Sequence, residues 1–314
     1  MNILVTGSNG QLGQEIKSIV DRNGNGTPDH YVGEPNYYAF VDVDELDITN
    51  EQAVLKYVSN NHISVIVNCA AYTNVEKAQT DWDTAYNVNA IGPLNLAFAA
   101  NTVGAVLIHI STDYVFGGQR NTPVPPVPVS TDLVNFPDIE RGDCYYGYSK
   151  NIGEHLIEQE KCKYLIFRTA WLYSEYGHNF VKTMLKRASE GLDSKVVMDQ
   201  TGSPTYAKDL AEFIYHIIED CDAENRYLSK TGVYNFTNKG ATSWYDFAYT
   251  IYNNYNGTGE EKVSPCMSSE FPSSVIRPNY SVLDTALTEK TFDYKIRNWQ
   301  TALADAMNNI KQNS

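Results

Sequence analysis

Three side chains in the sequence could together assist the reduction of a carbonyl group. Tyr146 and Lys150 stand in the stretch DCYYGYSKNIGEHLI at residues 143–157, and Thr112 stands in STDYVF at residues 111–116. A phenol can act as a general acid, an ammonium one helical turn away would lower the pKa of that phenol, and a hydroxyl can hold a carbonyl oxygen. Chance predicts about one Tyr-x-x-x-Lys spacing in so tyrosine-rich a chain, so the surroundings of the pair must decide its meaning.

The N-terminal residues predict the start of a phosphate-binding unit. NILVTG is a β-branched run that ends in glycine, and QLGQEIKSIV places apolar residues at helical spacing. The turn between them, GSNGQLG, puts Gly7, Gly10 and Gly13 in a G-x-x-G-x-x-G pattern. Glycines let the backbone approach a pyrophosphate, and a helix N-terminus offers it free N–H groups. A glycine turn that serves helix packing alone is the alternative.

Strands and helices alternate over the first half of the chain. The predicted strands YYAFVDV, SVIVNCA, AVLIHIS and KYLIFR are separated by the predicted helices NEQAVLKYVSNN and DWDTAYNVNAIGPLNLAFAANTVG and by the segment that carries Tyr146 and Lys150. This alternation predicts an α/β fold, a Rossmann-type doubly wound parallel sheet that binds ligands beyond the carboxyl ends of its strands. Thr112 lies at such an end, so hydroxyl, phenol and ammonium could meet near a nicotinamide ring.

The residue after the second strand bears on the choice of cofactor. Asp42 could accept hydrogen bonds from a ribose 2′-hydroxyl and would repel a 2′-phosphate. Because Val43 and Asp44 follow it rather than an arginine, we expect NADH to be favoured over NADPH. Asp42 could instead merely begin the acidic loop DVDELD.

Composition excludes several classes of function. The net charge of -14 over 314 residues argues against general nucleic-acid binding. The 5 cysteines are scattered, which predicts a reduced, cytoplasmic protein rather than a disulfide framework, and the 6 histidines make no metal-ligand pattern. With no leader before the first strand and no apolar run long enough to span a bilayer, we expect no membrane association.

The chain resembles the dTDP-4-dehydrorhamnose reductases of the extended short-chain dehydrogenase/reductase superfamily. The matching stretches run from residue 1 to about residue 284 and include MNILVTGSNGQLGQEI, VIVNCAAYTNVEKA, HISTDYVFGG, YGYSKNIGE, FRTAWLY, DQTGSPTYAKDLA and RPNYSVLD. The resemblance implies that NADH or NADPH reduces the 4-keto group of a dTDP-sugar substrate, dTDP-4-dehydro-L-rhamnose, for cell-surface polysaccharide. It makes Thr112, Tyr146 and Lys150 the catalytic residues.

The glycine turn and the resemblance together give the expected binding residues. The cofactor would contact Gly7, Gly10, Gln11, Leu12, Gly13, Asp42, Ala70, Ala71, Tyr72 and Lys150. The sugar nucleotide would contact Asp113, Tyr114, Trp171, Asn179 and Arg277. Arg277 also has a physical argument, because a guanidinium can grip a diphosphate with paired hydrogen bonds. Trp171 could equally be core packing, and Asn179 a helix cap.

The length of the chain suits two lobes. We expect residues 1–170 to form the dinucleotide-binding domain, with residues 203–238 packing back on it. Within that second range, TYAKDLAEFIYHIIEDC predicts an amphipathic helix. Residues 171–202 and 239–314 would form a smaller C-terminal lobe that binds the nucleotide-sugar.

Two departures from the family pattern lie near the expected site. GDCY precedes the catalytic tyrosine where the family usually has proline and asparagine, and the proline-rich stretch from residue 117 to residue 144 is unusually long. We expect that stretch to be an ordered loop beside the substrate mouth, either a lid or a passive insertion. Glu15 matches a magnesium position of dimeric relatives, but EGLDSK at residues 190–195 fits the other ligands poorly. No metal is therefore predicted, and a homodimer stays possible.

Two other functions stay open. A catalytically silent relative could bind NADP and regulate a partner enzyme, although such a subunit has no need of all three catalytic side chains. An epimerase or dehydratase acting on a related sugar nucleotide is the second alternative. The related 4,6-dehydratases carry a glutamate where this chain has Tyr114, which argues against the dehydratase.

Overall fold

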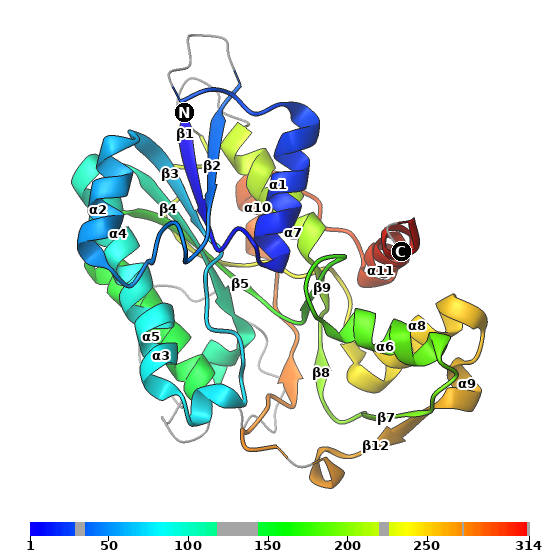
Figure 1. The fold of residues 1–314 in the computed structure, drawn as a ribbon. Helices are drawn as coiled ribbons and strands as arrows, with labels where there is room; N and C mark the ends of the chain where they lie inside the picture. Colours follow the sequence, from blue (N-terminus) through cyan, green and yellow to red (C-terminus); the bar gives the residue numbers. More distant parts are fainter. Residues whose placement is uncertain (29–34, 118–143, 220–225, 272, 313–314) are drawn as a thin grey trace.

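A twisted parallel sheet forms the centre of the computed structural model, which describes residues 1–28, 35–117, 144–219, 226–271 and 273–312 (Figure 1). Its strands are ordered β10-β5-β4-β3-β1-β2. The bounds are β1 (Asn2–Thr6), β2 (Tyr37–Val41), β3 (Ile63–Asn68), β4 (Val106–Thr112), β5 (Lys163–Thr169) and β10 (Gly232–Asn235). From β1 the chain builds β2 on one side and β3 on the other, so the predicted Rossmann-type sheet is confirmed.

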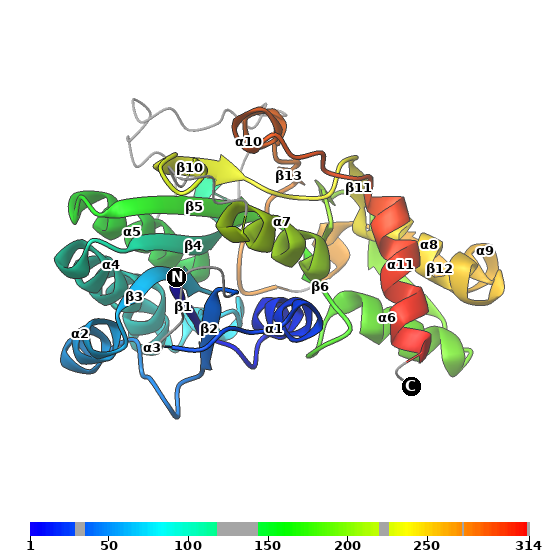
Figure 2. The same ribbon diagram turned by 90° about the horizontal axis from the view of Figure 1, so that it is seen from above.

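Helices cover both faces of this sheet (Figure 2). On one face lie α1 (Gln11–Asn23), α7 (Ala207–Glu219) and α10 (Ala286–Phe292), and on the other α2 (Glu51–Asn60), α4 (Gly92–Val103) and α5 (Tyr145–Gln159). The amphipathic helix predicted from TYAKDLAEFIYHIIEDC is α7, and it packs its apolar face into the core beside α1. Because successive residues of a strand point to opposite faces, β4 contributes Ile108 to one core and Leu107 to the other.

The long helix predicted between β3 and β4 is present and contains one irregular turn. It comprises α3 (Trp82–Tyr86), a π-helical turn over Asn87–Ile91, and α4, with Pro93 in its first turn. Proline has no N–H to donate to the preceding turn, which accounts for the irregular hydrogen bonding at this point. The Asn89 side chain of the π turn bonds the backbone of Tyr72 and the hydroxyl of Ser149, so the π turn ties the β3 loop to α5.

A second apolar core lies beyond the carboxyl ends of the sheet. It is built on α6 (Phe180–Ser189), α8 (Trp244–Asn256) and α11 (Trp299–Gln312). Short elements complete it: β6 (Leu172–Tyr173), β7 (Ser194–Val197), β8 (Thr201–Gly202), β9 (Thr205–Tyr206), β11 (Thr242–Ser243), α9 (Gly259–Lys262), β12 (Val263–Cys266) and β13 (Tyr280–Ser281). Phe292 and Ile296, predicted within the C-terminal lobe, instead pack into the core against α7. Residues around α10 thus belong with the first core.

Two further predictions concern a loop beside the substrate mouth and the absence of a membrane-spanning segment. The loop predicted over residues 117–144 beside the substrate mouth lies, except for its first and last residues, outside the described residues. Among the helices that the structure does describe, none combines the length and the apolar character needed to cross a bilayer.

Candidate active site

A cavity of about 860 Å³ opens at the carboxyl ends of the central strands. Strand by strand, its wall receives the glycine turn after β1, Asp42 after β2, Ala70 and Ala71 after β3, and Thr112 at the end of β4. Tyr146 and Lys150 come from α5, and Trp171, Asn179, Phe180 and Trp244 come from the second core. The fold therefore brings most of the predicted site residues to one cavity.

The glycine turn has the shape that a dinucleotide pyrophosphate requires. Gly7 has a φ of 63°, and a Cβ there would lie 2.6 Å from the backbone nitrogen of Ala70, so a side chain is excluded twice over. At Gly13 a Cβ would meet the Gly7 carbonyl oxygen at 2.6 Å. Gly10 is the N-cap of α1 and supplies no side-chain cap, so the first turn presents N–H groups at the cavity wall. These residues fit a bound nicotinamide dinucleotide.

Thr112 and Tyr146 lie together, as the sequence predicted. The Thr112 hydroxyl donates to Asp113 Oδ1 at 3.0 Å and accepts from the Tyr114 N–H at 3.2 Å. The Tyr146 ring meets the Tyr114 ring edge to face, with centroids 5.6 Å apart. Burial raises the pKa of Tyr146, and a hydrogen bond with Thr112 opposes that rise. The phenol therefore stays protonated across the ordinary pH range, which suits a proton donor.

Lys150, one helical turn after Tyr146 on α5, lines the same cavity and is almost fully buried. Its Nζ donates to the Ile110 carbonyl oxygen at 2.6 Å and lies 3.2 Å from His109 Nε2. Burial lowers the pKa of Lys150 to about 8, against the opposing effect of Glu154. The sequence predicted that Lys150 would lower the pKa of Tyr146. In this structure the pKa of Tyr146 is raised instead, because the phenol is buried and the neighbouring Asp113 carboxyl adds to the effect of burial.

Asp113 and Tyr114 also line the cavity, where the sequence placed substrate contacts. Burial raises the pKa of Asp113 to about 6, while hydrogen bonds from Ser281 and Thr112 counteract it. Within the described residues, its buried Oδ2 has no hydrogen-bond partner, so a carboxylate oxygen is free to accept from a ligand hydroxyl.

Trp171 and Asn179 reach the cavity from the second core. Trp171 has a φ of 50° and stacks on Trp244 with ring centroids 3.7 Å apart, a pairing that the sequence analysis did not find. A left-handed backbone at a tryptophan is unusual and often marks a functional position. Asn179 caps α6 by accepting from the Lys182 N–H at 3.0 Å, and it also donates to Gln11 Oε1 at 2.9 Å. The helix-cap interpretation is thus correct, and the same side chain joins α6 to the glycine turn.

Two predicted binding residues do not line the cavity. The Tyr72 hydroxyl donates to Asp81 at 3.0 Å, and its ring packs in a small aromatic cluster beside Tyr145. The Arg277 guanidinium donates to Glu76 Oε1 at 2.9 Å, in an ion pair that the sequence could not indicate. The Ser273 and Ser274 hydroxyls donate to the same carboxylate, and these bonds hold the pKa of Glu76 at about 2.

Glu15, which the resemblance placed at a magnesium position, is paired with another carboxyl group. Burial and a hydrogen bond with Glu175 raise the pKa of Glu15 to about 9. In the part of the chain that the structure describes, no three His, Cys, Asp or Glu side chains gather in a way that could hold a metal ion.

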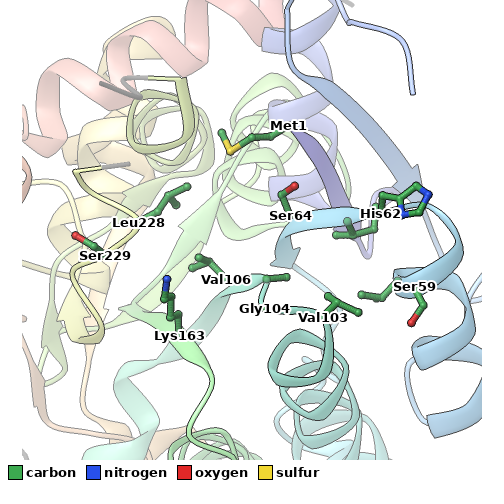
Figure 3. Close-up of a pocket in the computed structure, with 13 residues that line it drawn as sticks. Met1, Ser59, His62, Ser64, Val103, Gly104, Val106, Lys163, Leu228 and Ser229 are labelled. Carbon is green, nitrogen blue, oxygen red and sulfur yellow. The ribbon is translucent and has the colours of Figure 1, made fainter. Parts of the chain in front are cut away.

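A smaller hollow of about 460 Å³ lies at the amino ends of β3, β4 and β5 (Figure 3). His62, Ser59, Lys163 and Ser229 line it, together with aliphatic residues at the starts of the strands. It receives none of the predicted site residues, so the candidate site is the cavity at the carboxyl ends.

Known proteins of one kind match this chain over nearly its whole length. The family model described as the RmlD substrate binding domain matches residues 1–312. A dTDP-4-dehydrorhamnose reductase of Aggregatibacter actinomycetemcomitans is 34% identical, and the alignment covers 96% of each chain. The crystal structure of a dTDP-4-dehydrorhamnose reductase from Clostridium acetobutylicum superimposes with a TM-score of 0.82 at 38% identity, covering 99% of this chain and 100% of that one. A Bacillus anthracis dTDP-4-dehydrorhamnose reductase, solved in complex with NADP, gives 0.81 at 35% identity, covering 98% and 99%.

Proposed function

Because this chain belongs to the dTDP-4-dehydrorhamnose reductase family, we propose that it reduces the 4-keto group of dTDP-4-dehydro-L-rhamnose to give dTDP-L-rhamnose. The proposal rests above all on one observation. Thr112, Tyr146 and Lys150 line the same cavity as the glycine turn, where the N-terminus of α1 has no side-chain cap. The product would supply cell-surface polysaccharide synthesis, as the family resemblance implies.

Each of the three side chains has a defined task in this reaction. A bound nicotinamide cofactor supplies the hydride. Thr112 hydrogen-bonds the carbonyl oxygen and fixes its position, and Tyr146, whose pKa burial holds above its ordinary value, donates the proton that the oxygen needs. Lys150, whose amine is held by the Ile110 carbonyl, stands on the same cavity wall and adds positive charge there when it is protonated. Trp171 and Trp244 wall the side where a sugar nucleotide would lie.

The test is oxidation of the reduced cofactor in the presence of dTDP-4-dehydro-L-rhamnose prepared enzymatically. We expect turnover by the wild-type protein and a loss of at least about a hundredfold in Tyr146→Phe, the usual scale for a positioned acid. Tyr148→Phe is the matched control, since it removes a phenol from the same helix at a position outside the cavity. A Tyr146→Phe protein with wild-type rate would contradict the mechanism, and cofactor binding without any turnover would instead support the silent regulatory subunit.

Asp42 supports a preference for NADH. Its carboxylate lies on the cavity wall and accepts from the Asn9 N–H of the glycine turn at 2.9 Å, so a negative charge stands where a 2′-phosphate would approach. We expect a higher kcat/KM for NADH than for NADPH, and a reversed ratio in Asp42→Ser. Equal values in the wild-type protein would argue against this role, and the NADP complex of the Bacillus anthracis relative makes the comparison necessary.

Two expectations from the sequence complete the proposal. A cytoplasmic location would be tested by cell fractionation. A homodimer would be tested by light scattering of the purified protein in solution.

A further inference from the structure

A ladder of buried polar side chains crosses the sheet beneath the cavity. Thr6, Asn68 and His109 lie in register on β1, β3 and β4, and Lys150 of α5 covers the last of them. Their exposed fractions are 1%, 1%, 0% and 1%. The residues two positions earlier on the same strands belong to the apolar core: Leu4, Ile66 and Leu107. Because buried polar groups are costly unless hydrogen-bonded, the pairing along the ladder can be assigned donor by donor.

The orientation of Asn68 is fixed from one side. The backbone N–H of Ala70 donates to Asn68 Oδ1 at 3.1 Å, and the Thr6 hydroxyl donates to the same atom at 2.8 Å. A backbone N–H can only donate, so its partner must be the amide oxygen. The amide nitrogen of Asn68 then faces His109 Nδ1 at 3.0 Å and donates to it. His109 Nδ1 therefore carries no proton, and the neutral ring carries its proton on Nε2.

This tautomer has a consequence for Lys150. His109 Nε2 lies 3.2 Å from Lys150 Nζ, so its N–H is directed at the lysine nitrogen. A neutral amine can accept that hydrogen bond and still donate to the Ile110 carbonyl at 2.6 Å. An ammonium has no lone pair, so it would face the N–H donor to donor. The other tautomer creates a different donor–donor contact, because its Nδ1–H would point at the amide hydrogens of Asn68.

We propose that His109 is a positioning residue of the reductase, whose Nε2–H, oriented by Asn68, favours the neutral amine of Lys150 and so lets Lys150 release a proton inside the site. The inference rests on the proposed function, because it concerns recovery of the Tyr146 proton after reduction. In that step the N–H bond of the Lys150 ammonium breaks and the O–H bond of Tyr146 forms, directly or through a hydroxyl in the cavity. The amine that remains accepts from His109 and later takes a proton from water.

Other groups around Lys150 also affect its pKa. Glu154, one turn later on α5, and the Cys69 thiol at the end of β3 raise the pKa of Lys150, whereas burial lowers it more strongly. The Glu154 carboxylate is itself occupied by Arg168 of β5, which donates to it from two nitrogens. His109 adds no positive charge, because burial and Lys150 hold its own pKa well below the ordinary value.

The first test reads the tautomer directly and needs no activity. In the wild-type protein labelled with ¹⁵N-histidine, the ring nitrogens of His109 are assigned by elimination with single-histidine variants. We expect one Nε2–H tautomer that does not titrate between about pH 5 and pH 9. A proton on Nδ1, or an imidazolium, would overturn the inference even in an active enzyme. Absence of turnover by the wild-type protein would instead count against the proposed function.

The second test follows the pH dependence of kcat. In His109→Gln the amide oxygen can accept from the Lys150 ammonium, so we expect the alkaline limb of the kcat profile to move up by about one pH unit. His155→Gln, on α5 and outside the ladder, is the matched control and should leave the limb in place. An alkaline limb that is the same in His109→Gln and the wild-type protein would overturn the inference.

Discussion

Two buried cations lie on the same side of the sheet and differ in what surrounds them. Arg168 of β5 donates to both carboxylate oxygens of Glu154, and its guanidinium lies 4.8 Å from the ring centroid of Phe116. Lys150 of α5, one helical turn from Glu154, bonds a carbonyl oxygen and an imidazole, and no carboxylate bonds it in the part of the chain that the structure describes. One cation is neutralised in place, and the other is left able to change its charge.

This difference separates a structural charge from a functional one. A buried ion pair with three hydrogen bonds stabilises one arrangement of β5 against α5. A buried lysine with uncharged partners carries a desolvation cost whenever it is protonated, and the fold alone does not need that cost. Its position on the cavity wall, beside Tyr146, indicates that the cost is retained for chemistry.

The comparison is tested most strongly by replacing each cation with methionine. Lys150→Met should lose about 10² to 10⁴ in kcat, the range for groups that take part in proton transfer, while the free energy of unfolding changes by less than about 1 kcal/mol. Arg168→Met, its matched control, should keep most of its kcat per folded molecule. Steady-state kinetics and urea unfolding of both variants measure this. The functional assignment of Lys150 would be wrong if the two variants lost activity equally.

Stability should show the reverse order. Arg168→Met leaves the Glu154 carboxylate buried without its partner, and we expect the free energy of unfolding to fall by about 3 kcal/mol. Removing both charges in Arg168→Met/Glu154→Leu should recover most of that loss, because neither partner is then left unpaired. Urea unfolding of the two single variants and the double variant gives the coupling energy. Additive losses would show that the pair is not the stabilising unit.

The sequence predicted the sheet and the catalytic residues, but it did not predict which partners surround Lys150 and Arg168. Alternating strands and helices gave the sheet, and Gly7, Thr112, Tyr146 and Lys150 were found because each follows a strand or stands at helical spacing. Which partner each cation holds depends on strand register and on side chains far apart in the chain. Nothing in HISTDYVFGG indicates that His109 would meet Asn68, 41 positions earlier.

What the sequence could not indicate has the same origin. Arg277 was predicted to grip a diphosphate, and its ion pair with Glu76, 201 positions away in the chain, was not foreseen. Trp244 was missed because its stacking on Trp171 joins the segment after β5 to the start of α8, which are far apart in the chain. The predicted lowering of the Tyr146 pKa took Lys150 into account but not burial of the phenol, which follows from the packed fold and raises the pKa.

A neighbouring pair of carboxyl groups, one buried and one half-buried, extends the comparison to a smaller effect. Glu15 of α1 shares a hydrogen bond with Glu175, and burial with that neighbour raises the pKa of Glu15 to about 9. Above an unfolded value near 4.5, the unfolded chain has released this proton while the native protein still holds it. The contribution of Glu15 to stability is therefore full below pH 4.5 and is lost as the pH rises toward 9.

Glu15→Gln should remove this dependence, since glutamine does not titrate. Relative to the wild-type protein, the variant should gain stability as the pH rises from 5 to 8, by at most about 1.4 kcal/mol per pH unit and by less in total where Lys208 and Ser174 favour the charged form. Urea unfolding at four pH values measures the slope, with Glu51→Gln on the exposed start of α2 as the control. Equal slopes for the variant and the wild-type protein would mean that Glu15 is ionised in the native state. Burial would then have no effect on the protonation of Glu15, in contrast to Lys150, where burial lowers the pKa and so favours the uncharged form.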